Sequence, residues 1–205
     1  MRLLRTGLLF AFLALIAVTP SVTAQEATPT PLGAEHCTVD PIDPDAYNAA
    51  IMASIPPMAA DPNPTGTPAD DATVAAVTDT IEQSIACTNI GDLGRLLAVI
   101  DPAYAPTLLG VALKDVPAAV EAAAATSVHD VPATPLVDDI DQGALVSRLL
   151  GVENVQVLDN GQVSAQATVQ RLGYPVFQVT IYLRMDESLG RYIITNYTSF
   201  QVPLG

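Results

Sequence analysis

The sequence predicts an α+β domain in which a set of helices is followed along the chain by an antiparallel sheet. The C-terminal stretch, residues 152–202, alternates between apolar and polar residues and is interrupted by turn signals, as half-buried strands are. Residues 43–126 instead carry apolar residues at helical spacing behind acidic N-cap positions. A sheet with one apolar face needs a cover, and the upstream helices must supply it.

Four strands are expected in the C-terminal stretch. Residues 152–158 form the first, and Asn160-Gly161 then supplies the positive φ angles of a tight hairpin turn. Residues 162–170 and 175–185 form the next two, and residues 191–202 form the last. The inward face of the second strand is expected to hold Val163, Ala165, Ala167 and Val169, and that of the third Phe177, Val179, Ile181, Leu183 and Met185.

Three helices are expected within residues 43–101, each with its own start signal. Asp43-Pro44 opens a short helix over residues 45–55, in which Tyr47, Ile51 and Ile55 form an apolar stripe. Asp70 or Asp71 caps the main helix, which runs to Cys87 or Thr88. Asn89-Ile90-Gly91-Asp92 breaks that helix and caps a shorter, Leu-rich one. The apolar face of the main helix is expected to consist of Val74, Val77, Ile81 and Ile85.

The chain between the second helix and the sheet is the least regular. Residues 104–113 are expected to add one or two helical turns, and the Ala-rich residues 117–126 a helix that opens with Pro117. Residues 129–135 are expected to be a loop, and residues 143–150 a helical turn that leads into the sheet.

The N-terminus predicts export. Arg2 and Arg5 precede the apolar residues 8–18, and Val22-Thr23-Ala24 offers a small-residue cleavage site, so residues 1–24 are expected to be a signal peptide. The alternative is an uncleaved membrane anchor, although an apolar run of this length is too short for a spanning helix. We therefore expect a secreted or extracytoplasmic protein with no stable membrane association after cleavage. Residues 25–69 then form a Pro-rich acidic segment, and residues 70–205 the main domain.

The charge excludes some partners. The chain of 205 residues has a net charge of −14, and cleavage would make it −16 because it removes two arginines and no acid. Such a surface repels phosphate backbones and anionic lipid heads, so we expect neither nucleic acid nor a peripheral membrane as partner.

The only two cysteines, Cys37 and Cys87, both lie in the exported part. An even pair in an oxidising compartment predicts a disulfide, with two separate thiols as the alternative. No histidine stands near them at ligand spacing, so no metal site is expected.

The helical break and the last strands resemble the NTF2-like superfamily, which includes SnoaL-like cyclases, nuclear transport factor 2 and ketosteroid isomerase. The resemblance rests on the long helix that runs into Asn89-Ile90-Gly91-Asp92, on the hairpin Val155–Val163, on Gly190-Arg191-Tyr192-Ile193-Ile194, and on Phe200. It covers residues 70–205 and implies an α+β, cystatin-like cone in which a curved antiparallel sheet wraps the long N-terminal helix and leaves a pocket. In that family a strand or hairpin usually follows the second helix, and here residues 111–135 show none.

The resemblance implies chemistry inside the cone, but the inward positions hold no acid or base, and the family's catalytic acids match no residue here. We therefore expect no catalytic residue, cofactor or metal. His129-Asp130 is the alternative catalytic pair, and Asp138, Asp139 and Asp141 are an acidic turn with calcium binding as the alternative. The polar candidates near a pocket are Tyr104, Tyr182, Tyr192 and Asn196, for each of which ordinary packing is the alternative.

Three functions remain open. The leading hypothesis is a non-enzymatic module that binds a small apolar ligand or a protein partner. The second is an isomerase, cyclase or hydrolase of a small apolar substrate. The third is a homodimer formed through the polar sheet face of Gln178, Thr180 and Tyr182.

Overall fold

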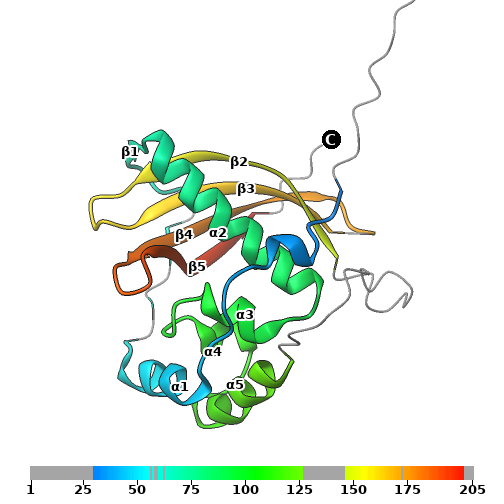
Figure 1. Ribbon diagram of the computed structural model, residues 1–205. Coiled ribbons are helices and arrows are strands. Elements are labelled where there is room, and N and C mark those ends of the chain that lie inside the picture. The colour runs from blue at the N-terminus through cyan, green and yellow to red at the C-terminus, as the bar shows by residue number, and fades with distance from the viewer. Residues whose placement is uncertain are drawn as a thin grey trace, which may run out of the picture.

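The computed structural model describes residues 30–55, 57, 60, 61, 63–126, 146–171 and 173–200. These form an α+β fold with one five-stranded antiparallel sheet, in the order β1-β2-β3-β4-β5 (Figure 1). The strands are β1 (Thr67–Pro68), β2 (Ser147–Val157), β3 (Val163–Arg171), β4 (Val176–Asp186) and β5 (Arg191–Phe200). The helices are η1 (Ala34–His36), α1 (Pro44–Ala53), α2 (Asp71–Asn89), α3 (Leu93–Ala98), α4 (Ala105–Leu109), η2 (Leu113–Asp115) and α5 (Val116–Ala125).

The strands β2 to β5 are joined by tight turns, as the sequence predicts. Gly161, Gly173 and Gly190 have positive φ angles of 80°, 80° and 63° in these turns, which glycine adopts without strain. All four predicted inward residues of β3 are buried. The predicted inward face of β3 is therefore confirmed.

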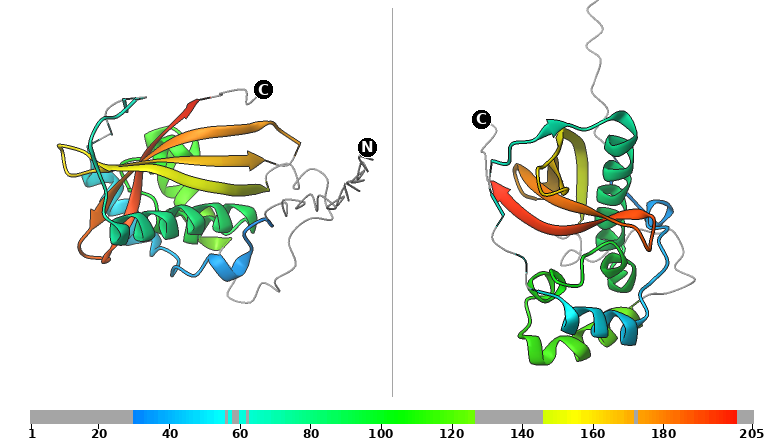
Figure 2. Two further views of the ribbon diagram at one scale, coloured as in Figure 1. Left: turned by 90° about the horizontal axis from the view of Figure 1, so that it is seen from above. Right: turned by 90° about the vertical axis from the view of Figure 1, so that its left-hand side faces the viewer.

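The long helix α2 lies across one face of the sheet (Figures 1 and 2). Its N-cap is Asp70, whose side chain accepts a hydrogen bond of 2.7 Å from the Thr73 N–H. This bond holds the pKa of Asp70 below its usual value. Val77 and Ile81 of α2 are fully buried against the sheet. We call the sheet face under α2 the inner face.

The opposite face of the sheet is covered as well, which the sequence did not predict. The described residues between α1 and β1, which are 57, 60, 61 and 63–66 and are here called the strap, lie against it. The Tyr182 hydroxyl donates a hydrogen bond to the Asp61 carbonyl of the strap. Thr180 and Tyr182 are 2% and 4% exposed. Two of the three residues expected to form a dimer surface are therefore buried within one chain.

The strap ends in β1, which pairs with the end of β2. Thr67 lies opposite Val157, and the Ala69 N–H donates to the Val155 carbonyl at 3.0 Å. A Cβ atom on the preceding Gly66 would lie 2.4 Å from the Val157 oxygen, so only glycine allows this close approach. Part of the predicted N-terminal segment is thus a strand of the sheet.

Helix α1 begins and packs as expected, but its stripe is shorter. Asp43 caps it by accepting from the Ala46 N–H, and Tyr47 and Ile51 are buried. The prediction for Ile55 is wrong, because that side chain is 86% exposed. The helix ends at Ala53, so Ile55 no longer follows the helical spacing.

Residues 93–126 form α3, α4, η2 and α5, which gather with α1 beyond one edge of the sheet (Figure 1). This group is attached to β5 directly. The Asp101 N–H donates to the Ile194 carbonyl and the Ile194 N–H to the Val99 carbonyl, both at 2.8 Å. The chain after α3 therefore pairs in parallel with the edge strand.

Two further predictions for the sheet are corrected. Residues 147–150 belong to β2 and are not a helical turn. The Asn89 side chain at the end of α2 explains this, because it donates to the Ser147 carbonyl and accepts from the Ser147 N–H, at 2.9 and 2.8 Å. Met185 is 43% exposed, so the apolar face of β4 does not remain buried up to the turn.

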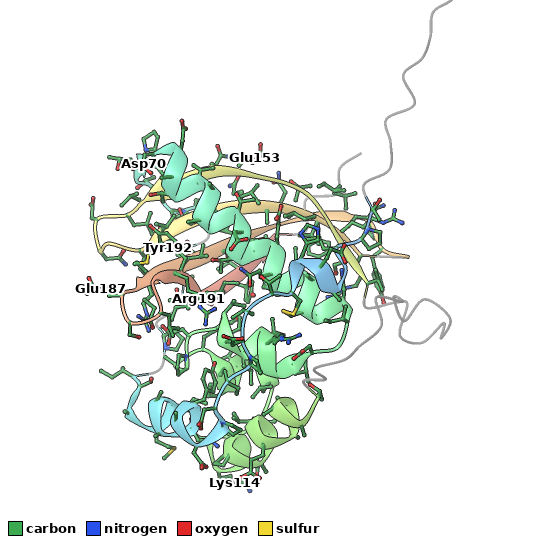
Figure 3. The ribbon with its side chains drawn as sticks, in the orientation of Figure 1. Asp70, Lys114, Glu153, Glu187, Arg191 and Tyr192 are labelled. Carbon is green, nitrogen blue, oxygen red and sulfur yellow. A yellow bond between two sulfur atoms is a disulfide. The ribbon has the colours of Figure 1, made fainter. Side chains whose placement is uncertain are left out.

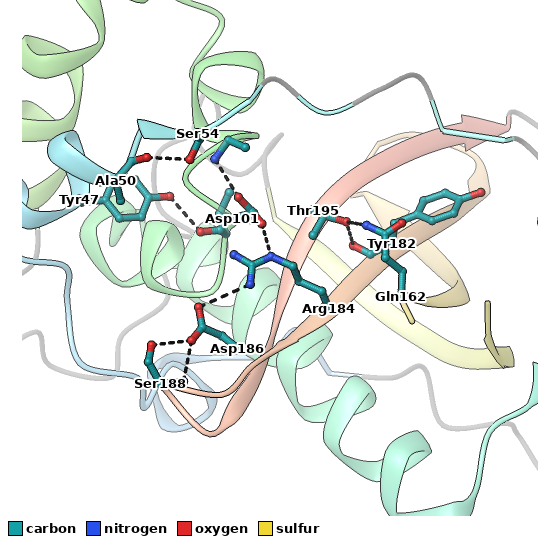
Figure 4. Close-up of polar contacts among 12 residues, drawn as sticks. Tyr47, Ala50, Ser54, Asp101, Gln162, Tyr182, Arg184, Asp186, Ser188 and Thr195 are labelled. Atoms are coloured by element: carbon teal, nitrogen blue, oxygen red, sulfur yellow. Dashed lines mark hydrogen bonds and ion pairs between the residues drawn. The ribbon is translucent and has the colours of Figure 1, made fainter. Parts of the chain in front are cut away.

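A junction of polar groups joins α1, the α3–α4 connection and β4 (Figure 4). The Tyr47 hydroxyl donates to the Ile100 carbonyl at 3.0 Å. The buried Asp101 carboxylate accepts from Arg184 Nε at 2.6 Å and from the Ala103 N–H at 2.8 Å. Burial, followed by the nearby Asp101 charge, raises the pKa of Tyr47 far above its usual value, so this hydroxyl stays protonated.

Cys37 and Cys87 form the predicted disulfide, with their Cα atoms 5.0 Å apart. Both are buried in the core, and the bond links the chain before α1 to the last turns of α2. Among the described residues, no helix is long and apolar enough to cross a membrane. The predicted signal peptide, His129, Asp130 and the aspartates 138, 139 and 141 lie outside the described residues.

Removal of the disulfide should loosen the N-terminal segment first. We expect the variant Cys37→Ala/Cys87→Ala to unfold at lower urea concentration, with a loss of about 2–4 kcal/mol, because the bond closes a loop of 50 residues. Limited proteolysis should cut within residues 38–69 while the sheet resists. Equally early cleavage within residues 163–186 would contradict this order.

Arg184→Ala should destabilise the polar junction by about 1 kcal/mol in urea unfolding. The Asp101 carboxylate stays buried and loses its ion partner, but Arg184 is 42% exposed, so water replaces part of the contact. Arg148→Ala on β2 is the control, since Arg148 makes no ion pair with the described residues. The same loss in both variants would show that the junction contributes nothing specific.

Candidate functional site

The four polar candidates do not converge on one site. Tyr104 is buried and contacts Tyr197 of β5. Tyr192 lies at the start of β5 on the inner face and is half-buried beside α2 (Figure 3). Tyr182 and Asn196 lie opposite each other in register, on the face that the strap covers. The candidates therefore divide between the two faces of the sheet.

A register shift in β5 places Asn196 on the same face as Tyr182. Leu183 pairs with Ile194, whereas Tyr182 pairs with Asn196 and Ile181 with Tyr197. One extra residue of β5 is thus accommodated between these pairs, as in a β-bulge. Ile194 and Tyr197 therefore share the inner face although they are three residues apart, and Asn196 turns to the other face.

The inner face carries a small pocket between the C-terminal half of α2 and the strands, with a volume of about 160 Å³. We call it the inner pocket. Strands β3 and β4 contribute alternate residues, as the period of two requires, and β2 and β5 contribute one residue each. The lining consists of Ser84, Ile85, Thr88, Ser147, Val169, Arg171, Phe177, Val179, Ile181 and Tyr197.

The pocket exists because α2 changes character along its length. Where Val77 and Ile81 face the sheet, their side chains fill the space completely. One and two turns later the residues are Ser84 and Thr88, whose short side chains bond back to the carbonyls of Ile81 and Ser84. The side chains of α2 therefore do not fill the space opposite Phe177 and Val179.

Tyr197 of the inner pocket is paired with Tyr104, which does not itself line the pocket. The rings of Tyr104 and Tyr197 have centroids 5.6 Å apart and are tilted by 54°, a favourable aromatic arrangement. Tyr197 lines the pocket, and Tyr104 packs against it from the turn before α4.

Burial sets the protonation of this pair. It raises the pKa of Tyr197 far above its usual value, with a smaller contribution from Tyr104, and a hydrogen bond with Ser84 opposes the shift. Burial also raises the pKa of Tyr104. Both hydroxyls are therefore neutral at physiological pH, so they can share hydrogen bonds but do not act as bases.

Arg171 is the one charged residue among those that line the inner pocket. Its guanidinium can pair with a carboxylate or a phosphate, but not act as a base. The lining thus combines apolar walls with the hydroxyls of Tyr197 and three Ser or Thr residues and with one cation, the composition of a binding site with a small number of polar groups.

Sequence reasoning missed Tyr197 and Arg171 as site residues. Arg171 falls at the end of β3, next to a turn, where a basic residue is unremarkable in sequence. Tyr197 follows the bulge, and strict alternation from Tyr192 assigns it to the wrong face. Only a pairing partner such as Ile181 could have revealed its position.

A larger cavity, of about 630 Å³, lies on the other face between the strap, the β2–β3 turn and β5. Tyr182 and Asn196 both line it, so two of the four candidates do meet there. Its lining mixes amide and hydroxyl side chains with prolines, Ala60 and Leu158. Within the described part of the chain, no group of three His, Cys, Asp or Glu side chains could hold a metal ion.

No protein-family model, no curated protein and no solved structure matches this chain.

Proposed function

We propose that the protein is an exported NTF2-like module that binds a small apolar ligand in the inner pocket. The observation that carries this proposal is the cluster of Phe177, Val179 and Ile85 around a space that the short side chains of Ser84 and Thr88 leave open. These apolar side chains are half-buried. A ligand that removes them from water therefore binds with a favourable free energy from the apolar area it buries.

Two features support the NTF2-like fold. A long helix crosses one face of a twisted antiparallel sheet, and Gly91, with φ of +74°, and the N-cap Asp92 turn the chain into a short Leu-rich helix. One feature departs from the family pattern. Helices α4 and α5 follow the second helix of the resemblance, where its members usually have a strand or a hairpin.

The disulfide supports export, because such bonds persist in oxidising compartments and are rare in the cytosol. The charge of −14 is consistent with a protein kept dispersed by self-repulsion.

The volume of the pocket limits the ligand. A cavity of about 150 Å³ lined by aliphatic and aromatic side chains binds benzene in another protein, whereas drug-sized ligands need about 300–1,000 Å³. The inner pocket, at about 160 Å³, therefore fits a single aromatic ring or the end of an alkyl chain. The Tyr197 hydroxyl and Arg171 would select a ligand with one hydrogen-bonding or anionic group.

An enzyme with a small apolar substrate is the alternative. The tyrosine pair is the feature that favours it, since a neutral hydroxyl can stabilise a developing oxyanion. Such an enzyme still needs a base, and none lines the inner pocket among the described residues.

The binding proposal can be tested with indole and benzoate as probes. We expect either probe to perturb the amide resonances of Phe177, Val179 and Tyr197 in a titration. Val179→Phe should fill the pocket and weaken binding at least tenfold, a loss of about 1.4 kcal/mol. Tyr197→Phe should weaken benzoate more than indole if the hydroxyl contacts the carboxylate.

The matched control is Val176→Phe, the same exchange on β4 three residues earlier, outside the inner pocket. It should leave binding unchanged. If no probe perturbs the pocket residues, or if both phenylalanine variants bind as the parent chain does, the pocket is merely a packing defect and the proposal is wrong.

A further inference from the structure

The cavity under the strap has the features of a second binding site. Its volume of about 630 Å³ lies within the range of about 300–1,000 Å³ that ligand sites occupy. It lies on the sheet face opposite the inner pocket, so the two sites share no lining residue.

The walls of this cavity combine a linked set of amides and hydroxyls with apolar surface from the strap and Leu158. Gln162 donates to the Thr195 hydroxyl at 3.2 Å, and that hydroxyl donates to the Tyr182 carbonyl at 3.2 Å (Figure 4). Asn160 donates to Gln162 Oε1 at 2.9 Å. These bonds fix the side chains in place, and each amide still has N–H groups or lone pairs beyond the bonds it makes here.

A neighbouring polar recess of about 190 Å³ shares Pro64 and Thr65 of the strap with this cavity. In it, the Gln156 side-chain oxygen is fully buried and has no hydrogen-bond partner among the described residues. A buried acceptor of this kind is rare in proteins, because losing water without gaining a partner costs about 1–3 kcal/mol. Polar groups therefore continue beyond the main cavity, and the Gln156 side-chain oxygen there can still accept a hydrogen bond.

The charges around the cavity exclude one class of ligand. Asp61 and Asp159 line it, and no Lys or Arg does so among the described residues. An anion such as a phosphate or a carboxylate would therefore be repelled, and it would find no cation to pair with.

We propose that this cavity binds a neutral, hydroxyl-rich molecule, a mono- or disaccharide. Sugar hydroxyls donate and accept at once, which matches the mixed amide, hydroxyl and carboxylate lining. Leu158 and the strap prolines add apolar surface that fits the C–H faces of a sugar ring. The site does not depend on the inner pocket or on its proposed ligand.

The test is an NMR titration of the full chain with glucose, mannose, cellobiose and chitobiose, with spermidine and inorganic phosphate as charged probes. We expect at least one saccharide to shift the side-chain amide resonances of Gln162 and Asn196, and phosphate to shift neither. Gln162→Ala and Asn196→Ala should each weaken that saccharide at least tenfold.

The matched control is Gln170→Ala, an amide on the same side of β3 but outside the cavity, and it should bind as the parent chain does. Because an alanine in the wall could disturb the fold, the isosteric Gln162→Glu serves as a second variant. It keeps the shape, removes the donors, and should also lose the saccharide.

Three results would overturn the proposal. They are shifts with spermidine alone, no shift with any saccharide, and saccharide binding that survives both alanine variants. Indole binding to the Gln162→Ala variant tests the two sites separately. If this variant still binds indole, the inner pocket is intact, and a loss of saccharide binding then concerns the cavity under the strap alone.

Discussion

The packing of α2 across the inner face of the sheet is the constraint on which the rest of the structure depends. Val77 and Ile81 exclude water from the centre of that face, and Asn89 fixes where β2 begins. The disulfide then ties the chain before α1 to the same helix. Since the far end of α2 carries Ser84 and Thr88 instead of larger apolar residues, the packing that stabilises the domain also leaves the inner pocket open.

The two faces of the sheet are covered by different physical means. On the inner face, apolar side chains of α2 and the strands exclude water, and the free energy comes from the area they bury. On the other face, the strap lies over hydroxyls and amides, so its position depends on hydrogen bonds such as the one from Tyr182 to Asp61. Both covers leave a cavity, and the larger of the two lies under the strap.

Local signals in the sequence predicted much of the fold. The N-caps Asp43, Asp70 and Asp92, the turn glycines and the alternation in β3 each act over a few residues, and the structure has them as expected. The candidate site was predicted less well. Tyr182 and Asn196 meet in a cavity, but Tyr104 only supports Tyr197 and Tyr192 lies beside α2. The β5 bulge explains why Tyr197 was missed, because it exchanges the faces of the residues that follow it and no local sequence pattern indicates it.

The sequence by itself determined the fold class, the helix starts, the hairpin turns and the pairing of the only two cysteines, because each depends on local backbone preferences or on a count. The tertiary structure decided what covers the polar face, where β2 begins and which tyrosine lines the inner pocket. These features depend on residues far apart in the chain, such as Asn89 with Ser147 and Asp61 with Tyr182. Such contacts form only when the whole chain has folded, and no local pattern encodes them.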